Sequence, residues 1–244
     1  MTDPGAETAA QSFDILGETV TLPVRVRDAT IHTAMFAVPA QGAQDLVDPS
    51  GLTVAPVAPG RTLCALMFID YLDGDLKTYR EYGVGFAVRG AGGPGASRVG
   101  ALVHRLPVTE EFTLEAGRKI WGFPKVMSDI ALSKESGAAR GVLRIGGDLV
   151  ADLRIARGLP VPGGGPTAAV DVYTHFKGRT RRIPWSLRPG ATRSRPGGAH
   201  LLLGPHPWGE ELRGLGLPRP ALASTSMTGV QMEFGAAAEV ATAP

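Results

Sequence analysis

The chain has 244 residues, of which 43% are hydrophobic and 20% are charged, and its formal net charge is +2. This length is enough for one large domain or at most two, and the composition is typical of a globular protein. A nearly neutral charge excludes a general attraction to nucleic acid or to an acidic membrane surface.

The single cysteine, Cys64, excludes an internal disulfide framework and is typical of the reducing cytoplasm. The N-terminus has neither the basic start nor the apolar core of a signal peptide. No uninterrupted apolar run approaches the roughly 18 residues that a membrane span needs. We therefore expect a cytoplasmic protein with no nucleic-acid partner and no membrane partner.

Residues 1–12 are small and polar, so we expect a flexible leader followed by a single domain over residues 13–244. The 33 glycines and 20 prolines lie between apolar runs rather than in one tract. Frequent breakers between short runs rich in β-forming residues predict many strands joined by tight turns.

In the first half of the chain the pattern predicts mainly strands, with Pro23 at an edge position. The predicted strands cover residues 18–27, 29–38, 61–72, 78–89 and 99–106. Residues 41–47 are predicted to form a short helix, and 90–95 a flexible loop. Thr109, two glutamates in the first turn and Gly117 past the end predict a helix over 109–117.

The second half is also predicted to be rich in strands, with a Pro/Gly-rich connection at 159–166. The predicted strands cover residues 130–134, 139–145, 149–156, 170–176, 199–203 and 227–234. Residues 210–215 are predicted to form a helical turn. With no internal repeat and no linker, the sequence predicts one α+β domain dominated by antiparallel β-sheet.

The segment GRKIWGFPKVM (117–127) places Lys125 among apolar and aromatic residues. If these neighbours enclose the ammonium, desolvation lowers the pKa of Lys125, and a neutral amine can attack a carbonyl to form a Schiff base. The alternative is that Lys125 ends a strand and extends its ammonium to water.

A second candidate group lies in the segment YREY (79–82). On a strand, Tyr79 and Glu81 share one face, and a carboxylate in an apolar strand is a candidate acid or base. The alternative is an edge-strand charge that faces water.

The other sequence patterns carry less information about function. The five histidines do not pair at metal-binding spacing, so we expect no metal. No nucleophile elbow is present, and we expect no cofactor. The basic stretch KGRTRR (177–182) is typical of a solvated hairpin, with a funnel for an anionic substrate as the alternative.

The segment GRKIWGFPK (117–125) resembles the acetoacetate decarboxylase family segment, in which Gly-Arg-Glu precedes Gly-Phe/Tyr-Pro-Lys. The strand YRE (79–81) resembles the family's Tyr-x-Glu strand. Residues 200–207 and 215–218 resemble its C-terminal region, so the similarity extends from about the first strand to Phe234. The resemblance implies a barrel- or cone-shaped sheet that encloses the active site, and assembly into a homo-oligomer.

Carried onto this sequence, the resemblance makes Lys125 the Schiff-base lysine and Glu81 the active-site glutamate. The family's N-terminal arginine corresponds to Arg25 or Arg27, and we take Arg27 as the candidate. The candidate substrate-binding residues are therefore Arg27, Tyr79, Tyr82, Arg118, Trp121 and Phe123.

The sequence departs from the family pattern in three respects. Val126 stands where the decarboxylase has a second lysine, Lys119 replaces the glutamate of Gly-Arg-Glu, and Leu66 and Met67 occupy the neighbourhood of a second active-site glutamate. Adjacent side chains on a strand point to opposite faces, so a following lysine need not approach the amine. We expect Val126 to make the wall drier and imine chemistry to survive.

The resemblance implies a Schiff-base lyase that acts on a keto acid, with decarboxylation of an acetoacetate-like β-keto acid ranked first. The alternative is an aldolase or dehydratase of a biosynthetic pathway, acting on a keto acid or aldehyde through the same iminium and enamine. A small-molecule binding protein without turnover is the third hypothesis.

Overall fold

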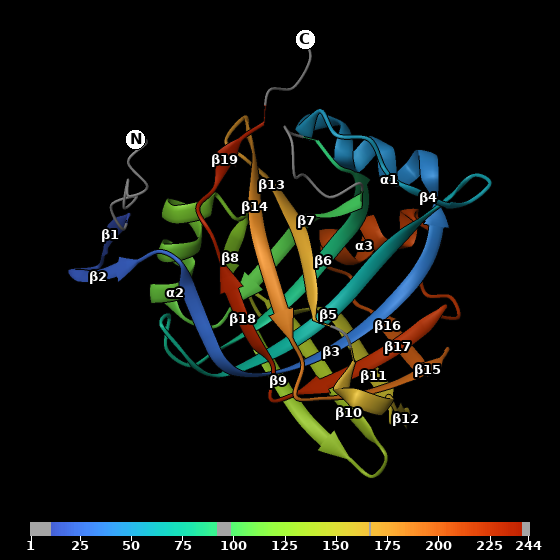
Figure 1. Ribbon diagram of the computed structural model, residues 1–244. Helices are drawn as coiled ribbons and strands as arrows, with labels where there is room; N and C mark the ends of the chain where they lie inside the picture. Colours follow the sequence, from blue (N-terminus) through green and yellow to red (C-terminus); the bar gives the residue numbers. More distant parts are fainter. Residues whose placement is uncertain (1–10, 92–98, 166, 241–244) are drawn as a thin grey trace, which may run out of the picture.

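A closed β-barrel organises the computed structural model, which describes residues 11–91, 99–165 and 167–240 (Figure 1). The long strand β3 closes the barrel because it pairs with β5 along most of its length and with β18 near its start. Within the described residues, seven strands form the barrel, in this order: β3 (Val24–Pro39), β5 (Arg61–Gly74), β6 (Tyr79–Arg89), β7 (Val99–Val108), β13 (Ala168–Phe176), β14 (Arg179–Arg188) and β18 (Gln231–Phe234).

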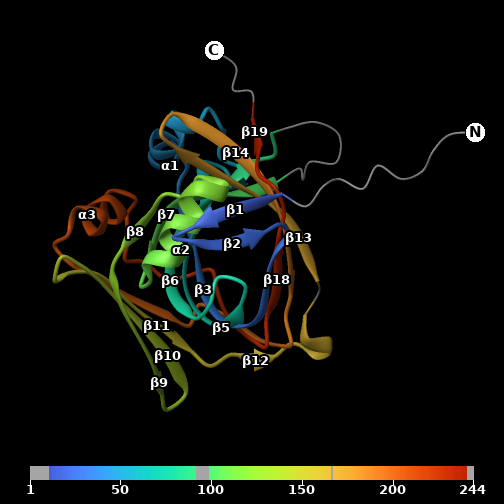
Figure 2. The same ribbon diagram turned by 90° about the vertical axis from the view of Figure 1, so that its left-hand side faces the viewer.

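Most neighbouring strands are antiparallel, but β7 runs parallel to β13 and also to the short β8 (Lys125–Met127). Shorter strands extend the barrel sheet: β4 (Pro56–Ala58), β12 (Leu159–Pro160), β15 (Ala191–Pro196), β17 (Ala223–Thr228) and β19 (Ala238–Glu239). The hairpin of β1 (Ser12–Ile15) and β2 (Glu18–Thr21) lies beside α2 (Glu111–Ala116) (Figure 2).

A second sheet packs against the outside of the barrel. Its strands are β9 (Asp129–Glu135), β10 (Ala138–Ile145), β11 (Asp148–Ala156) and β16 (Ala199–Leu203). The remaining helices are α1 (Ala40–Val47), α3 (Pro207–Gly214), the 3-10 turns Asp48–Ser50 and Pro162–Gly164, and the π-helix η2 (Gly117–Trp121). In the described part of the chain, no helix is long and apolar enough to cross a membrane.

Alternation along the barrel strands produces two separate cores. Ile31 and Ile69 point into the barrel, where they join one apolar cluster. Phe36 and Leu66, on the opposite face of the same strands, pack with Leu153 of the second sheet in another cluster. A residue's position on a barrel strand therefore decides whether it can line the barrel interior.

The predicted α+β class dominated by antiparallel sheet is confirmed, but several element boundaries differ. Residues 18–38 were predicted as two strands with a break near Asp28; the chain instead turns at Pro23, and β3 continues to Pro39 through a bulge at Asp28. Residues 227–234 are likewise divided at Gly229, whose φ of 61° turns the chain from β17 into β18.

The helix predicted over 109–117 also begins and continues differently. Thr109 is not its N-cap, because its hydroxyl accepts the N–H of Arg80, and Glu110 precedes the first turn. The helical segment does not end at Gly117. This residue keeps a right-handed helical backbone conformation and begins η2. The predicted leader at 1–12 falls mainly on residues 1–10, outside the described residues, as does most of the loop at 90–95.

Candidate functional site

Three neighbouring segments bring Lys125 into the barrel. Helix α2 continues as η2, and Gly122, with φ 71°, ends η2 as a left-handed cap. The chain then enters β8, where Lys125 pairs with Leu106 of β7. A π-helical turn is uncommon and is frequently found at functional sites.

The Lys125 ammonium is enclosed. The lysine is 3% exposed, and its Nζ lies 3.0 Å from Glu81 Oε2 and donates to Thr113 Oγ1 at 2.9 Å. The Tyr79 ring centroid lies 5.0 Å from Nζ. On the helix side, a Cβ built on Gly117 would lie only 2.6 Å from Lys125 Cδ and Cε. Glycine at 117 therefore makes room for the lysine side chain.

Burial lowers the pKa of Lys125, while the carboxylate of Glu81 opposes this shift by stabilising the ammonium. Glu81 is itself buried and accepts a second hydrogen bond, from Tyr71 Oη to Oε1 at 3.0 Å. Burial, and then the charge of Glu81, raise the pKa values of Tyr71 and Tyr79, so both phenols stay protonated as donors.

The structure therefore brings together two of the expected residues around Lys125. Glu81 forms the ion pair, and Tyr79 covers the ammonium with its ring and stacks on Tyr71 at 4.1 Å between centroids. Arg118 approaches β8 from outside the barrel, and its Nε donates to the backbone oxygen of Lys125 at 2.9 Å.

Trp121 and Phe123 lie near η2 but serve packing. The two rings are 5.7 Å apart, and Trp121 also contacts Phe234 and donates its indole N–H to Gly235 O at 2.8 Å. Tyr82 lies on the opposite face of β6 from Glu81, in the core between the barrel and the second sheet. Its hydroxyl is buried and has no hydrogen-bond partner among the described residues.

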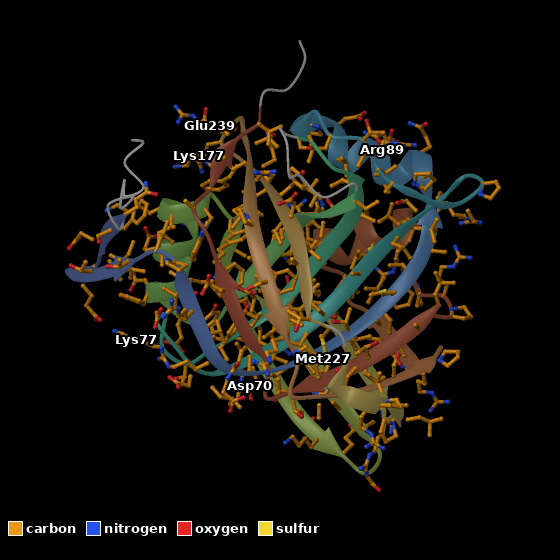
Figure 3. All side chains as sticks on the ribbon, viewed as in Figure 1. Asp70, Lys77, Arg89, Lys177, Met227 and Glu239 are labelled. Carbon is orange, nitrogen blue, oxygen red and sulfur yellow. The ribbon has the colours of Figure 1, made fainter. Side chains whose placement is uncertain are left out.

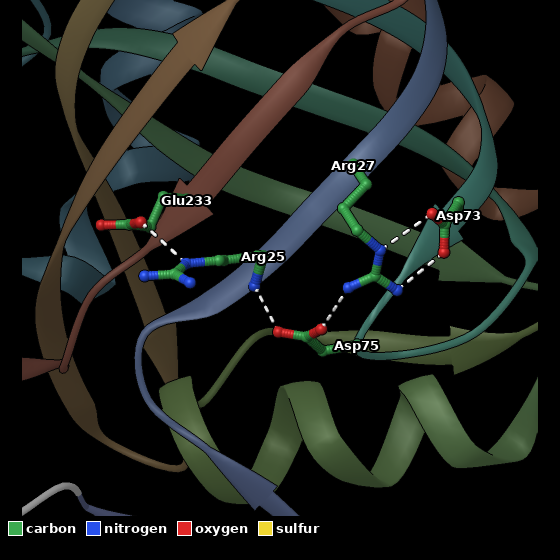
Figure 4. Close-up of polar contacts among 5 residues, drawn as sticks. All are labelled: Arg25, Arg27, Asp73, Asp75 and Glu233. Carbon is green, nitrogen blue, oxygen red and sulfur yellow. Dashed lines mark hydrogen bonds and ion pairs between the residues drawn. The ribbon is translucent and has the colours of Figure 1, made fainter.

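Arg27 lies on β3 beside two aspartates, Asp73 and Asp75 (Figure 4). Its guanidinium is half-exposed and binds Asp73 at 2.7 Å and Asp75 at 2.6 Å. The other candidate arginine, Arg25, is also exposed and pairs with Glu233 at 3.3 Å. Neither arginine contacts the residues that surround Lys125, because both lie on the solvent side of β3.

The residues that depart from the family pattern occupy different environments. Val126 is half-buried on the other side of β8, so the surroundings that bury Nζ are Tyr79, Thr113 and Glu81 rather than Val126. Lys119 is turned away from the site and donates to Asp14 O. Met67 faces the barrel interior, where it packs close to Gly83.

Sequence reasoning missed Thr113, Tyr71 and Gly117. Tyr71 had a usable signal, because a hairpin through 72–75 pairs Tyr71 with Tyr79 and Ile69 with Glu81, which puts Tyr71 diagonally opposite Glu81. Thr113 and Gly117 are four residues apart on one helical segment, so they share a face. Nothing in the sequence indicated that this face would meet Lys125.

A known protein family matches most of the chain. The family model described as "Acetoacetate decarboxylase (ADC)" matches residues 16–239. The chain belongs to this family. The comparison with curated proteins found no match.

Solved structures of the acetoacetate decarboxylase fold superpose on the chain. An acetoacetate decarboxylase from Legionella pneumophila is 16% identical, with a TM-score of 0.69 over 90% of this chain and 87% of that one. The enduracididine biosynthesis enzyme MppR, complexed with the condensation product of pyruvate and imidazole 4-carboxaldehyde, is 13% identical, with a TM-score of 0.68 over 98% and 100%.

An acetoacetate decarboxylase-like enzyme from Sphingomonas wittichii RW1 is 16% identical, with a TM-score of 0.62 over 93% of this chain and 96% of that one. At these identities the superpositions establish the shared fold. The barrel expected from the resemblance is thereby confirmed.

Proposed function

We propose that the protein is a Schiff-base lyase in which Lys125 is the nucleophile and Glu81 is the general acid and base. The observation that carries the proposal is the buried contact between Lys125 Nζ and Glu81 Oε2 at 3.0 Å. Transfer of a proton from the ammonium to the carboxylate produces a neutral amine and a carboxylic acid in one step. Burial of Lys125, which lowers its pKa, favours this transfer.

The amine attacks the substrate carbonyl carbon, and the resulting carbinolamine loses its hydroxyl as water when Glu81 returns the proton. The product is an iminium on Lys125. If the substrate is a β-keto acid, its carboxylate leaves as carbon dioxide and the bonding electron pair moves into the iminium to form an enamine. Protonation of the enamine carbon and addition of water release the ketone and restore the amine.

Decarboxylation of an acetoacetate-like β-keto acid is the first candidate reaction, and family membership supports it. The carboxylate of the substrate loses its charge as it becomes carbon dioxide. A site without water therefore destabilises the charged substrate more than the transition state. The apolar inward-facing residues beside Glu81 fit that requirement, since its cross-strand neighbours are Ile69 and Val108.

An aldolase or dehydratase is the second candidate, because it uses the same iminium and enamine and the inward-facing residues of β6 beyond Glu81 are small. The inward positions that follow Glu81 on β6 carry Gly83, Gly85 and Ala87, and Ala101 of β7 pairs with Ala87. Gly85, Ala87 and Ala101 are only partly buried. In this reaction the enamine attacks an aldehyde instead of taking up a proton. The MppR structure holds the condensation product of pyruvate and an aldehyde, imidazole 4-carboxaldehyde.

Borohydride trapping tests the proposal. Incubation with acetoacetate or pyruvate, followed by reduction, is expected to add the mass of the reduced imine at Lys125, as measured by intact mass and peptide mapping. Lys125→Ala is expected to give no adduct, and Lys134→Ala is the matched control. The absence of an adduct across a panel of keto acids would contradict both enzyme hypotheses and would favour a small-molecule binding protein without turnover.

The two reactions differ in their products. Release of carbon dioxide from acetoacetate supports the decarboxylase, whereas a condensation product from pyruvate and an aldehyde, found by mass spectrometry, supports the aldolase. Assembly into a homo-oligomer stays a prediction, and sedimentation velocity tests it.

A further inference from the structure

A cleft outside the Lys125 site is lined mainly by cations. It lies between η2 and the turn that joins β13 to β14, and its volume is about 540 Å³. Five of its lining side chains are cationic: Arg118, Lys119, Lys177, Arg179 and Arg181. Among the described residues that line it, Glu115 is the single carboxylate.

Neighbouring carboxylates neutralise only part of this charge. Arg118 pairs with Glu115 at 3.8 Å, and Arg179 pairs with Glu239 at 3.3 Å. In the described residues, no carboxylate forms an ion pair with Lys177 or Arg181. The cationic side chains repel one another across the cleft. Binding of an anion would relieve this repulsion and is therefore favoured.

The backbone of Lys177 supplies an independent observation. Its φ is 51° and that of Gly178 is 74°, as in the two-residue hairpin turn that favours Asn-Gly. A lysine is unfavourable in this left-handed conformation, and such outliers are often kept for function. Lys77, with φ 68°, is also left-handed, but its ammonium has a carboxylate partner, Glu18, whereas that of Lys177 has none among the described residues.

The Arg181 guanidinium packs against the backbone at Gly122. A Cβ built on Gly122 would lie 2.0 Å from Arg181 Nη1, so the guanidinium occupies the space that a side chain at 122 would take. The ring of Phe176 adds an apolar wall between cations, with Lys177 Nζ at 5.5 Å and the Arg118 guanidinium at 5.9 Å from its centroid. The cleft is therefore a shaped site and not only a basic stretch of sequence.

We propose that this cleft binds a small, multiply charged anion that carries phosphoryl or several carboxylate groups. Planar guanidinium groups bind such oxygens in pairs, and a lysine adds a mobile point charge. The site is separate from the reactive amine, whose Nζ is enclosed by Glu81 and Thr113. The two are connected by Arg118, which lines the cleft and donates to the backbone oxygen of Lys125.

Isothermal titration calorimetry with pyrophosphate and with tricarballylate tests the proposal on the full chain. We expect saturable binding of one anion per chain that weakens as salt is added. The double variant Lys177→Gln and Arg181→Gln is expected to bind at least tenfold more weakly. The control is Arg89→Gln, an exposed arginine far from Lys177 and Glu239 in Figure 3, which is expected to bind like the parent.

The tighter of the two anions identifies phosphoryl or carboxylate groups as the preferred chemistry. Circular dichroism checks that each variant is folded, and Lys177→Gln, on an exposed turn, serves alone if Arg181→Gln unfolds. No saturable binding of either anion, binding of several anions with equal weak affinity, or equal losses in the cleft and Arg89 variants would overturn the proposal. None of these results depends on imine formation at Lys125.

Discussion

At the scale of single residues, Lys125 is subject to two opposing influences. Burial favours its neutral form, and Glu81 favours its charged form. A buried ion pair is costly to form, and it is weak evidence for stability. The Lys125–Glu81 pair can lose both charges by moving one proton. Thr113 accepts a hydrogen bond from the ammonium, and Tyr71 donates one to the carboxylate. Proton transfer explains this arrangement better than stability does.

Gly117→Ala tests the fit of Lys125 against the helix. Alanine stabilises a helix interior by about 1 kcal/mol relative to glycine. At 117, however, the added Cβ would lie 2.6 Å from the lysine Cδ and Cε, so the side chain must move. We expect the rate of imine trapping to fall by roughly tenfold or more.

The matched control is Gly214→Ala at the end of α3, where a Cβ would meet nothing within 4 Å. It is expected to leave trapping unchanged. Equal trapping rates in both variants would contradict the tight packing of Gly117 against Lys125.

Tyr71→Phe tests the donor to Glu81. The phenol donates to Oε1 at 3.0 Å in a buried site, and a hydrogen bond to a charged group contributes about 1.5–3 kcal/mol. Its loss is expected to lower kcat by roughly tenfold or more, because Glu81 loses both charge stabilisation and orientation. Steady-state kinetics with the substrate identified by trapping measures the effect.

Tyr82→Phe is the control for Tyr71→Phe. Its hydroxyl is buried on the opposite face of β6, with no partner in the part of the chain that the structure describes. Removing an unsatisfied buried hydroxyl is expected to leave kcat unchanged and to keep or raise Tm. A kcat loss in Tyr82→Phe equal to that in Tyr71→Phe would mean that general packing, not the bond to Glu81, is responsible.

At the scale of elements, strand β7 links the site to the outside of the barrel. It pairs with β8, which carries Lys125, and its outer face holds α3 through Glu211. Glu211 Oε2 accepts from Arg105 at 2.6 Å and Oε1 from His104 at 2.8 Å. Although burial opposes ionisation, these two partners lower the pKa of Glu211 to about 2.

Glu211→Gln is expected to lower the free energy of unfolding by about 3 kcal/mol at pH 7. A depressed carboxyl pKa gives stability that is present above the ordinary value near 4.5 and is lost as pH falls toward 2. The difference from the parent should therefore shrink between pH 4.5 and 2, as measured by urea titration.

The neighbouring Glu210→Gln provides the comparison, since that carboxylate is largely exposed and, among the described residues, pairs only with Arg213. It is expected to change stability by less than about 1 kcal/mol. A Glu211→Gln effect that stays the same at pH 7 and pH 2.5 would contradict the assigned ion pair.

The sequence predicted elements best where the pattern was long and regular. The strand at 61–72 follows from its apolar run, and the strand at 78–89 follows from the hairpin turn between the two; they correspond to β5 and β6. The π-helix could not be predicted, because its five residues, ending at Trp121, carry no periodicity of their own. Strands β15 and β17 were also missed, since their sequences, ATRSRP and ASTSMT, contain few apolar residues.

At the scale of the whole molecule, barrel closure decides which candidates can act together. Glu81 and Lys125 are 44 positions apart along the chain, and the pairing of β6 with β7 and of β7 with β8 brings them together. Motif resemblance identified both residues without this geometry. It could not exclude Arg27 or Tyr82 from the site, because the face that each residue presents depends on the bulge in β3 and on the register of β6.

The pH dependence of borohydride trapping at Lys125 tests the central claim most directly. Only the neutral amine attacks the carbonyl, so the trapping rate should rise with pH around the pKa of Lys125. The account predicts a midpoint below the ordinary lysine value of 10.5, since burial lowers this pKa. Glu81→Gln removes the opposing charge and should move the midpoint lower still. A midpoint at or above 10.5, or an adduct on another lysine, would contradict the account.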